Sequence, residues 1–561
     1  MVTNKYITRI ASVIMAAAVI LCLMASLFSD KLQEVYGNNA VTMKYESKLF
    51  STDQIMDIDI LMDEDDWNNM LENAISEEYY SCNVVVNGKT FYSVGIRPKG
   101  NTSLSSIAND PDTDRYSFKL EFDHYIEGQT CYGLDKLILN NNYADATNMK
   151  EAIVYDMYQY LGVDASLYNY AKISVNGDYR GVYLALEAVE DSFMLRNYGT
   201  EDGNLYKPES MGIGGGVDGN GFPQMGEMPD GADFPQKGEM PDGEDFPQMG
   251  EAPNGEAADI KMGIMGGNGG ADLNYTDDDL DSYSTIWDGE ITDSDKKDHK
   301  RVVEALKNIS EGTDLETYMD VDNILKYMAV HTFVVNDDSL SGTMAHNYYL
   351  YEYNGKLNIL PWDYNLSFGG MSMGGKMGGQ SLGATSVIND AIDTPFSITD
   401  FFDALLENEE YLEQYHGYLN ELVEKYVNGG EFEKTYERIR SQIDDLVGND
   451  PTAFYSYEEY EEAANMLIEV VQLRAKSVSG QLAGTIPSTD EGQQQDSSNL
   501  IDGSDIDLSV MGSFSGGGGG NEGQGKDNGF AGTPQPFDAG DVSPISEEKA
   551  DLQDSNQDSV K

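Results

Sequence analysis

A hairpin centred on residues 354 and 355 constrains the fold more than any other feature of this sequence. Two β-rich runs, NYYLYEY (347–353) and KLNILPWD (356–363), are separated by Asn354-Gly355, a pair typical of two-residue hairpin turns. Counting outward from that turn sets Asn347 opposite Trp362 and His346 opposite Asp363. The sequence therefore predicts that an amide and a carboxylate leave the open end of the hairpin on neighbouring rungs, ~5 Å apart.

Further oxygen-bearing side chains lie just before this hairpin. A short loop carries Asn336, Asp337 and Asp338 and enters from the same open end. Mg²⁺ or Mn²⁺ takes one or two protein oxygens together with waters and substrate phosphates, and protein kinases arrange an Asn and two Asp in this way. Asp338, with Asp337 as its alternative, could face a substrate hydroxyl while Asn347 and Asp363 hold metal. The competing interpretation is that these residues only cap turns.

The run NDDSLSGTMAHNYYLYEYNGKLNILPWDYNLSFG resembles the signature of the CotH (spore coat protein H) kinase family, which has N-x-D, then HNYYLY, then PWD. Other segments agree in family order: GIRPKGNTS, SFKLEFD, LILNNNYADATNMKE, VNGDYRGVYLALEAVEDSFM and GNLYK. The resemblance covers roughly residues 45 to 480. It implies an atypical, secreted kinase that phosphorylates Ser or Thr of proteins with ATP and a divalent metal. One departure is Asn365, which stands where many relatives have Asp, so the pattern supplies no second carboxylate ligand there.

Basic residues in the first half of the chain are candidates for binding the phosphates of ATP. A second hairpin, at Asn87-Gly88, delivers Arg97, Lys99 and Asn101 into a loop beside a flexible Gly. This loop could be a phosphate cradle or an ordinary surface turn.

A kinase also needs one Lys that reaches the α- and β-phosphates. Lys119 in the strand SFKLEF and Lys207 in GNLYK are equal candidates for that role. Glu187, at the end of GVYLALE, could hold the Lys in place.

The pattern of strands and helices predicts an α+β fold. A third hairpin at Asn176-Gly177 and a helix over 148–162 that ends at a Gly complete an antiparallel sheet backed by a helix. Helical periodicity then dominates from residue 293 onward. Together with the resemblance, this predicts an atypical protein-kinase-like two-lobed fold over 44–484, with an antiparallel-sheet N-lobe and a mainly helical C-lobe.

Low-complexity segments interrupt and follow this domain. Residues 208–270 contain three copies of a twelve-residue unit, of which DFPQKGEMPDGE is one, and their Gly, Pro and Met content predicts a disordered insertion. Residues 485–561 are rich in Gly, Ser, Asp and Gln and are predicted to be a disordered acidic tail.

The pattern of the amino-terminal segment predicts that the chain is exported from the cytoplasm. Residues 10–28 contain no charge and are long enough to cross a bilayer, so they are either a retained signal anchor or a cleaved signal peptide. Lys5 and Arg9 place residues 1–9 in the cytoplasm and the bulk of the chain outside. Outside, Cys82 and Cys131 could pair or remain free.

The charge composition limits the classes of molecule that this protein is expected to bind. The 35 basic and 98 acidic residues give a net charge of -63, so nucleic acid is not an expected partner. We expect a membrane-anchored extracytoplasmic kinase that acts on Ser or Thr of surface or secreted proteins. The alternatives are a catalytically silent adhesion or scaffold protein on the same fold, and a transferase that moves AMP.

Overall fold

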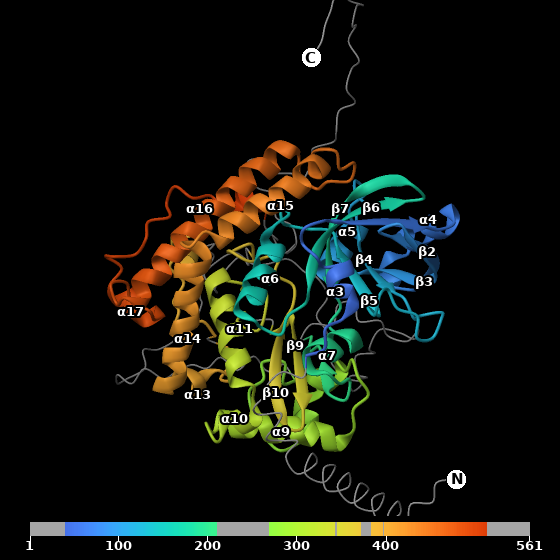
Figure 1. Cartoon of the computed structure of the whole chain (residues 1–561). Coiled ribbons are helices and arrows are strands. Elements are labelled where there is room, and N and C mark those ends of the chain that lie inside the picture. The colour runs from blue at the N-terminus through green and yellow to red at the C-terminus, as the bar shows by residue number, and fades with distance from the viewer. Residues whose placement is uncertain (1–39, 210–268, 343–344, 372–382, 397, 513–561) are drawn as a thin grey trace, which may run out of the picture. The chain divides into compact units, whose positions relative to one another are not determined.

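The computed structural model describes residues 40–209, 269–342, 345–371, 383–396 and 398–512 (Figure 1). The predicted membrane segment, most of the repeat insertion and most of the acidic tail lie outside these ranges. None of the helices within them is long and apolar enough to span a bilayer.

Seven strands in the first part of the chain form a closed barrel, in the order β1-β2-β3-β4-β5-β7-β6. Neighbouring strands pair antiparallel except β1 and β6, which run parallel with Met56 beside Ala171 and Ile60 beside Val175. The strands are β1 (Met56–Leu61), β2 (Tyr80–Val86), β3 (Lys89–Lys99), β4 (Ser117–Glu121), β5 (Lys136–Asn140), β6 (Tyr168–Val175) and β7 (Asp178–Glu187).

The predicted two-lobed kinase-like fold with an antiparallel-sheet N-lobe is wrong, because this sheet closes on itself. The hairpins at Asn87-Gly88 and Asn176-Gly177 are present, with left-handed backbone at both Asn residues. Closure comes from the parallel pairing of β1 with β6, whose residues are more than a hundred positions apart in the sequence. Closing the barrel leaves no strand edge unpaired.

Apolar side chains at alternate positions along the strands fill the barrel interior. In β1, the side chains of Met56, Ile58 and Ile60 are completely buried while Asp57 is exposed, as expected for a strand with one face turned to a core. Cys82 and Cys131 belong to the same apolar cluster and are both free thiols.

A second, three-stranded sheet has the order β10-β9-β8. It consists of β8 (Asn204–Tyr206), β9 (Tyr348–Tyr353) and β10 (Lys356–Pro361). Lys356 pairs with Tyr353 and Pro361 with Tyr348, which is the register predicted from Asn354-Gly355. Both turn residues have positive φ, as this turn type requires.

Helices surround both sheets. Those in the barrel part are α3 (Lys44–Lys48), α4 (Glu64–Glu72), α5 (Thr102–Ala108), α6 (Lys150–Leu161) and α7 (Asp191–Tyr198). The remaining helices are α8 (Ser284–Asp288), α9 (Lys296–Ser310), α10 (Leu315–Tyr318), α11 (Val321–Val334), α12 (Ala384–Ile388), α13 (Asp403–Leu406), α14 (Glu409–Glu421), α15 (Glu431–Gly448), α16 (Tyr457–Leu482) and α17 (Asp490–Gln495). Figure 1 shows the barrel strands on the right and α14 and α16 on the left, with α15 lying beside β7 at the top and β9 and β10 in the lower centre.

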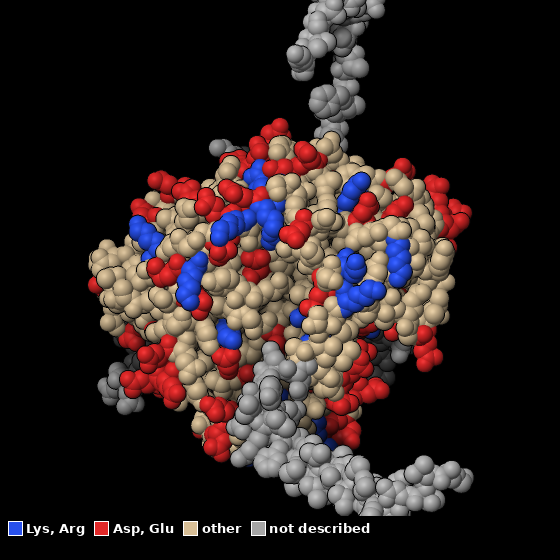
Figure 2. Space-filling model, in the orientation of Figure 1, with Lys and Arg blue, Asp and Glu red and all other residues tan. Residues whose placement is uncertain are grey.

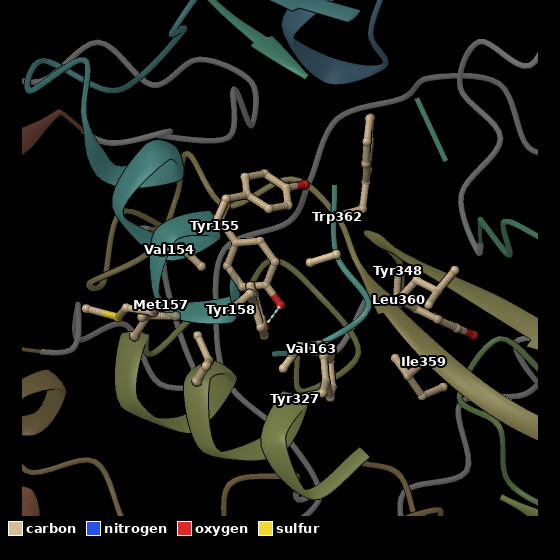
Figure 3. Close-up of a cluster of buried hydrophobic side chains, with 14 of the residues drawn as sticks. Val154, Tyr155, Met157, Tyr158, Val163, Tyr327, Tyr348, Ile359, Leu360 and Trp362 are labelled. Atoms are coloured by element: carbon tan, nitrogen blue, oxygen red, sulfur yellow. Dashed lines mark hydrogen bonds between the residues drawn. The ribbon is translucent and has the colours of Figure 1, made fainter. Parts of the chain in front are cut away.

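The largest apolar cluster joins α6, α11 and the β9–β10 hairpin. Tyr158 from α6 and Tyr327 from α11 stack with ring centroids 6.1 Å apart, and Ile359 and Leu360 from β10 are completely buried beside them (Figure 3). Because one core contacts all three elements, the hairpin and α6 hold fixed positions relative to each other.

Residues 485–512, which the composition assigned to the tail, pack onto this body. Met511 is 1% exposed and its carbonyl accepts a hydrogen bond from the backbone N–H of Ala146. The buried Arg115 makes a further connection between the barrel and the helices, because Nη1 donates to Asp450 Oδ2 at 2.7 Å and Nη2 to the carbonyl of Val182 at 2.6 Å.

The surface reflects the acidic composition. On the face shown in Figure 2, Asp and Glu are scattered over the whole surface, and Lys and Arg lie singly or in small groups between them.

Candidate active site

A pocket of about 380 Å³ lies where the barrel, α6 and the open end of the β9–β10 hairpin meet. Its lining includes eight of the ten residues singled out from the sequence: Arg97, Lys99, Asn101, Lys119, Lys207, Asp338, Asn347 and Asp363. The two others, Asp337 and Glu187, are not among its lining residues. Side chains from both halves of the described chain therefore converge on one cavity.

The two polar residues flank the open end of the hairpin: Asn347 directly precedes the ladder, and Asp363 follows it after Trp362. The last paired residues are Tyr348 and Pro361, and both Asn347 and Asp363 then adopt left-handed backbone, with φ of 57° and 60°. Non-glycine residues in this region are uncommon and concentrate at functional sites. The left-handed turns end the ladder and start two separate loops that border the pocket.

Asp338 is held by two neighbours on the approach to the hairpin. Asn347 Nδ2 donates to Asp338 Oδ2 at 3.1 Å and to the Asp338 carbonyl at 2.8 Å, and His346 Nε2 lies 2.9 Å from Asp338 Oδ1. Burial lowers the pKa of His346, but the hydrogen bond and charge of Asp338 outweigh it, so the pKa is raised. Because Asn347 uses its nitrogen on Asp338, its oxygen is the amide atom left for a cation. Asp337, in contrast, is exposed.

Lys99 lines the pocket and is hydrogen-bonded to a neutral partner, Asn140. Its Nζ donates to Asn140 Oδ1 at 3.0 Å, and Asn140 Nδ2 donates to Glu151 Oε2 at 2.8 Å. The Lys99 ammonium also lies 5.4 Å from the centroid of the Trp362 ring. Burial lowers the pKa of Lys99, and the negative charge of Asp363 partly opposes this effect.

The other cations of the pocket are paired with carboxylates. Arg97 pairs with Glu77, and Lys207 Nζ lies 2.6 Å from Glu209 Oε1. Lys119 pairs with Glu190, which also binds Lys136. Asn101 precedes α5 and makes no side-chain capping bond to it.

Glu187 takes a different partner from the one expected. Its carboxylate is completely buried and receives hydrogen bonds from Arg196 Nε at 2.9 Å and Nη2 at 2.6 Å, and from the Tyr45 hydroxyl. It therefore holds neither Lys119 nor Lys207, and Glu190 takes that place beside Lys119.

The pocket has more buried oxygen acceptors than protein donors. Glu151 Oε1 in the pocket wall is buried without a hydrogen-bond partner, and so is Asn336 Oδ1 in the loop just before Asp338. Burial and then the charge of Asp363 raise the pKa of Glu151 to about 8, and burial also raises the pKa of Asp363. Uncompensated buried oxygens of this kind suit a hard divalent cation.

The ligand set would be small. Among the described residues, no group of three or more His, Cys, Asp or Glu side chains is arranged to hold a metal. Asp363 and the Asn347 oxygen both line the pocket and are the candidate ligands from the sequence; one or two such oxygens, completed by water and phosphate, would be a usual arrangement for Mg²⁺.

Sequence reasoning missed Glu151, Asn140, Glu190 and Glu209 as pocket residues. Glu151 and its neighbour Lys150 are the first two residues of α6, and both are buried. An acidic residue in the first turn of a helix is ordinary, so the sequence offered no signal that set Glu151 apart.

Comparison with known proteins gives one match. No curated protein matches this chain. A family model described as CotH kinase protein matches residues 96–478, which include all ten candidate site residues and both halves of the pocket. The chain therefore belongs to the CotH kinase family.

Proposed function

We propose that this protein is a metal-dependent protein kinase that transfers the γ-phosphoryl group of ATP to Ser or Thr hydroxyls of proteins. The observation that carries the proposal is the convergence of Lys99, Asp338, Asn347 and Asp363 on one pocket. Family membership supports phosphoryl transfer. The pocket supplies a cation for phosphate, oxygens for metal and a carboxylate for a hydroxyl.

Each residue has a distinct role in the proposed reaction. Lys99 binds the phosphates, while Asp363 and Asn347 hold Mg²⁺ or Mn²⁺, which neutralises charge on the β- and γ-phosphates when bound. Asp338 orients the acceptor hydroxyl, whose oxygen attacks the γ-phosphorus as the bond to the bridging oxygen of ADP breaks. The hydroxyl proton passes to the Asp338 carboxylate and then to water.

The environment of Asp338 suits this role. Asn347 and His346 fix both oxygens of its carboxylate, and only 9% of the residue is exposed. Asn347 contacts Asp338 through its nitrogen and would hold the metal through its oxygen, so one side chain would connect the acceptor side with the phosphate side of the pocket. Asp337 is the matched control, because it is the same residue type in the same loop.

The proposed location is outside the cytoplasm. It is supported by the uncharged segment 10–28 preceded by Lys5 and Arg9. The acceptors would accordingly be surface or secreted proteins. Protease added to intact cells should digest the chain beyond the anchor, and protection of the repeats at 221–256 would reverse this orientation.

The decisive experiment determines which phosphate of ATP is transferred to the acceptor. The full-length chain is incubated with Mg²⁺ or Mn²⁺, a Ser-rich protein acceptor, and ATP labelled on either the γ- or the α-phosphate. The proposal predicts transfer of the γ label alone. Asp338→Asn should still bind ATP but lose transfer by ~10²-fold or more if Asp338 is the general base, while Asp337→Asn should remain active.

The other outcomes identify the alternatives. Incorporation of the α label would indicate transfer of AMP. Binding of ATP without incorporation of either label would favour an adhesion or scaffold protein. Loss of activity in Asp337→Asn with normal activity in Asp338→Asn would show that the other member of the Asp pair acts on the hydroxyl.

A further inference from the structure

A buried histidine lies behind the pocket, between the two segments that carry its carboxylates. His331 is on α11, is 2% exposed and is not among the pocket-lining residues. Its ring is stacked between Tyr327 and Phe396, with centroid distances of 5.4 and 5.3 Å. The stacking fixes the plane of the ring, and hydrogen bonds on its two edges fix which way each nitrogen points.

One nitrogen contacts the segment that carries the metal-side carboxylate. His331 Nδ1 lies 3.0 Å from the hydroxyl of Tyr364, which directly follows Asp363. The Tyr364 hydroxyl is also 2.5 Å from the Tyr158 hydroxyl on α6. Tyr364 is completely buried, so this contact fixes the backbone next to Asp363.

The other nitrogen contacts the loop that carries Asp338. His331 Nε2 lies 2.8 Å from Ser341 Oγ and 3.2 Å from Ser339 Oγ. Both serine hydroxyls in turn donate to the carbonyl of Asn336, at 2.9 and 3.1 Å. These bonds close the loop of residues 336–341 around the imidazole. Asp338 lies at the centre of that loop.

The ring is suited to join the two segments without adding a charge. Burial lowers the pKa of His331 to about 3, so the imidazole is neutral at physiological pH. A neutral imidazole donates from one nitrogen and accepts at the other. It can therefore serve hydroxyl groups on both sides at once, which an apolar residue of the same shape cannot do.

The loop also needs to be held. Val335, between α11 and Asn336, has a φ of 49°, which is strained for a β-branched residue. Such a conformation persists only where surrounding contacts impose it. The hydrogen bond from Phe368 N–H to the Val334 carbonyl at 2.7 Å holds one side of this turn, and the His331–Ser341 contact holds the other.

We propose that His331 is a positioning residue, which sets the separation between Asp338 and Asp363 by hydrogen bonding to Ser341 on one side and Tyr364 on the other. The inference rests on the proposed kinase function, since the separation matters only if a hydroxyl and a phosphate must meet. A histidine that serves packing alone would tolerate replacement by another ring, whereas this one needs both nitrogens.

The test replaces the nitrogens and keeps the ring. In the full-length chain, His331→Phe preserves the stacking but removes both polar contacts, while His331→Asn and His331→Gln each retain one polar group. We expect kcat to fall at least 10-fold in His331→Phe with less than a 3-fold change in the Kd of metal-bound ATP. The Asn or Gln variant should recover part of the loss. His416→Asn is the control, because His416 contacts Asp393 near the surface of α14.

A double-mutant cycle separates positioning from general damage. Tyr364→Phe breaks the same connection from the other end, so its effect on kcat should not multiply with that of His331→Phe. Three results would each overturn the proposal: effects of the two substitutions on kcat that multiply in the double variant, a kcat per folded molecule that His331→Phe leaves unchanged, or losses of kcat and of ATP affinity that are equal in His331→Phe.

A readout without catalysis distinguishes this proposal from the kinase proposal. If the native chain fails to transfer phosphate, the proposed function fails, but hydrogen exchange still tests the connection. Amide exchange in residues 336–342 should be faster in His331→Phe while exchange in α11 is unchanged. Equal exchange rates in the loop would show that His331 does not position it.

Discussion

Replacing Glu151 with Gln should stabilise the metal-free protein, and the gain should depend on pH. Glu151 is 3% exposed, and one of its two oxygens has no hydrogen-bond partner. Burial and the nearby charge of Asp363 raise its pKa from 4.5 to about 8. The folded state therefore holds a proton that the unfolded chain releases at neutral pH.

The sign and size of the effect follow from this difference in pKa. Below pH 4.5 the carboxyl is neutral in both states and costs nothing. Between pH 4.5 and about 8 only the unfolded chain loses the proton, so the free energy of unfolding falls by about 1.4 kcal/mol per pH unit. Above pH 8 the full cost is on the order of 5 kcal/mol by this linkage. The attraction of Lys99 is already contained in the pKa of about 8, so we expect Glu151→Gln to gain about 4 kcal/mol at pH 8.

Urea denaturation in the presence of a chelator measures this gain. The full-length native chain and Glu151→Gln are compared at pH 5 and pH 8, with Glu201→Gln, a change at an exposed position, as the control. At pH 5 the two free energies of unfolding should differ by less than about 1 kcal/mol. Two results would refute the assignment of Glu151 as a destabilising buried carboxyl. One is the same difference in free energy of unfolding between the two proteins at both pH values, and the other is a Glu151→Gln variant that is less stable than the native chain at pH 8.

Three further predictions concern the metal, the phosphate and the hairpin. Asp363→Asn should weaken metal-dependent ATP binding by at least about 10-fold in calorimetry, and an unchanged affinity would exclude Asp363 as a ligand. Glu209→Gln should tighten binding of metal-bound ATP by about 2- to 5-fold because it frees Lys207 from a partly exposed ion pair; weaker binding would show that Glu209 itself contacts the metal. Gly355→Ala should destabilise the chain by about 1 kcal/mol because φ is +83°, whereas Gly417→Ala, in the interior of α14 with open space around it, should stabilise it by about 0.5 kcal/mol in thermal unfolding.

The parts of the fold that the sequence predicts are the local ones. Asn354-Gly355 specifies a turn, the turn specifies the register, and the register places Asn347 and Asp363 at the same end of the hairpin. No contact beyond the hairpin itself is needed for that inference. The other two Asn-Gly hairpins and the Gly162 end of α6 were predicted for the same reason.

The errors arose where distant segments meet. Pairing of β1 with β6 depends on two strands that no turn connects, and their local patterns permit an open sheet as well as a barrel. Glu187 was expected to face a lysine, but strand alternation does not say which neighbour covers a given face, and Arg196 from α7 covers it. Glu151 reaches the pocket because α6 packs against β6 of the barrel and against α11, contacts that the local pattern of the helix does not specify.

The pairing of charges inside the pocket suggests why an acidic chain can bind an anion there. Lys207 has its own carboxylate in Glu209, and a phosphate must compete with that carboxylate for the ammonium group. Lys99 is instead held by the neutral Asn140. An amide positions the ammonium without neutralising it, so a phosphate can approach Lys99 without breaking an ion pair. The net charge of -63 is distributed over the whole chain and screened beyond ~8 Å in physiological salt. Affinity for phosphate is therefore decided by the few groups around Lys99, and the carboxylate of Asp363 beside it makes a metal ion the natural companion of that phosphate.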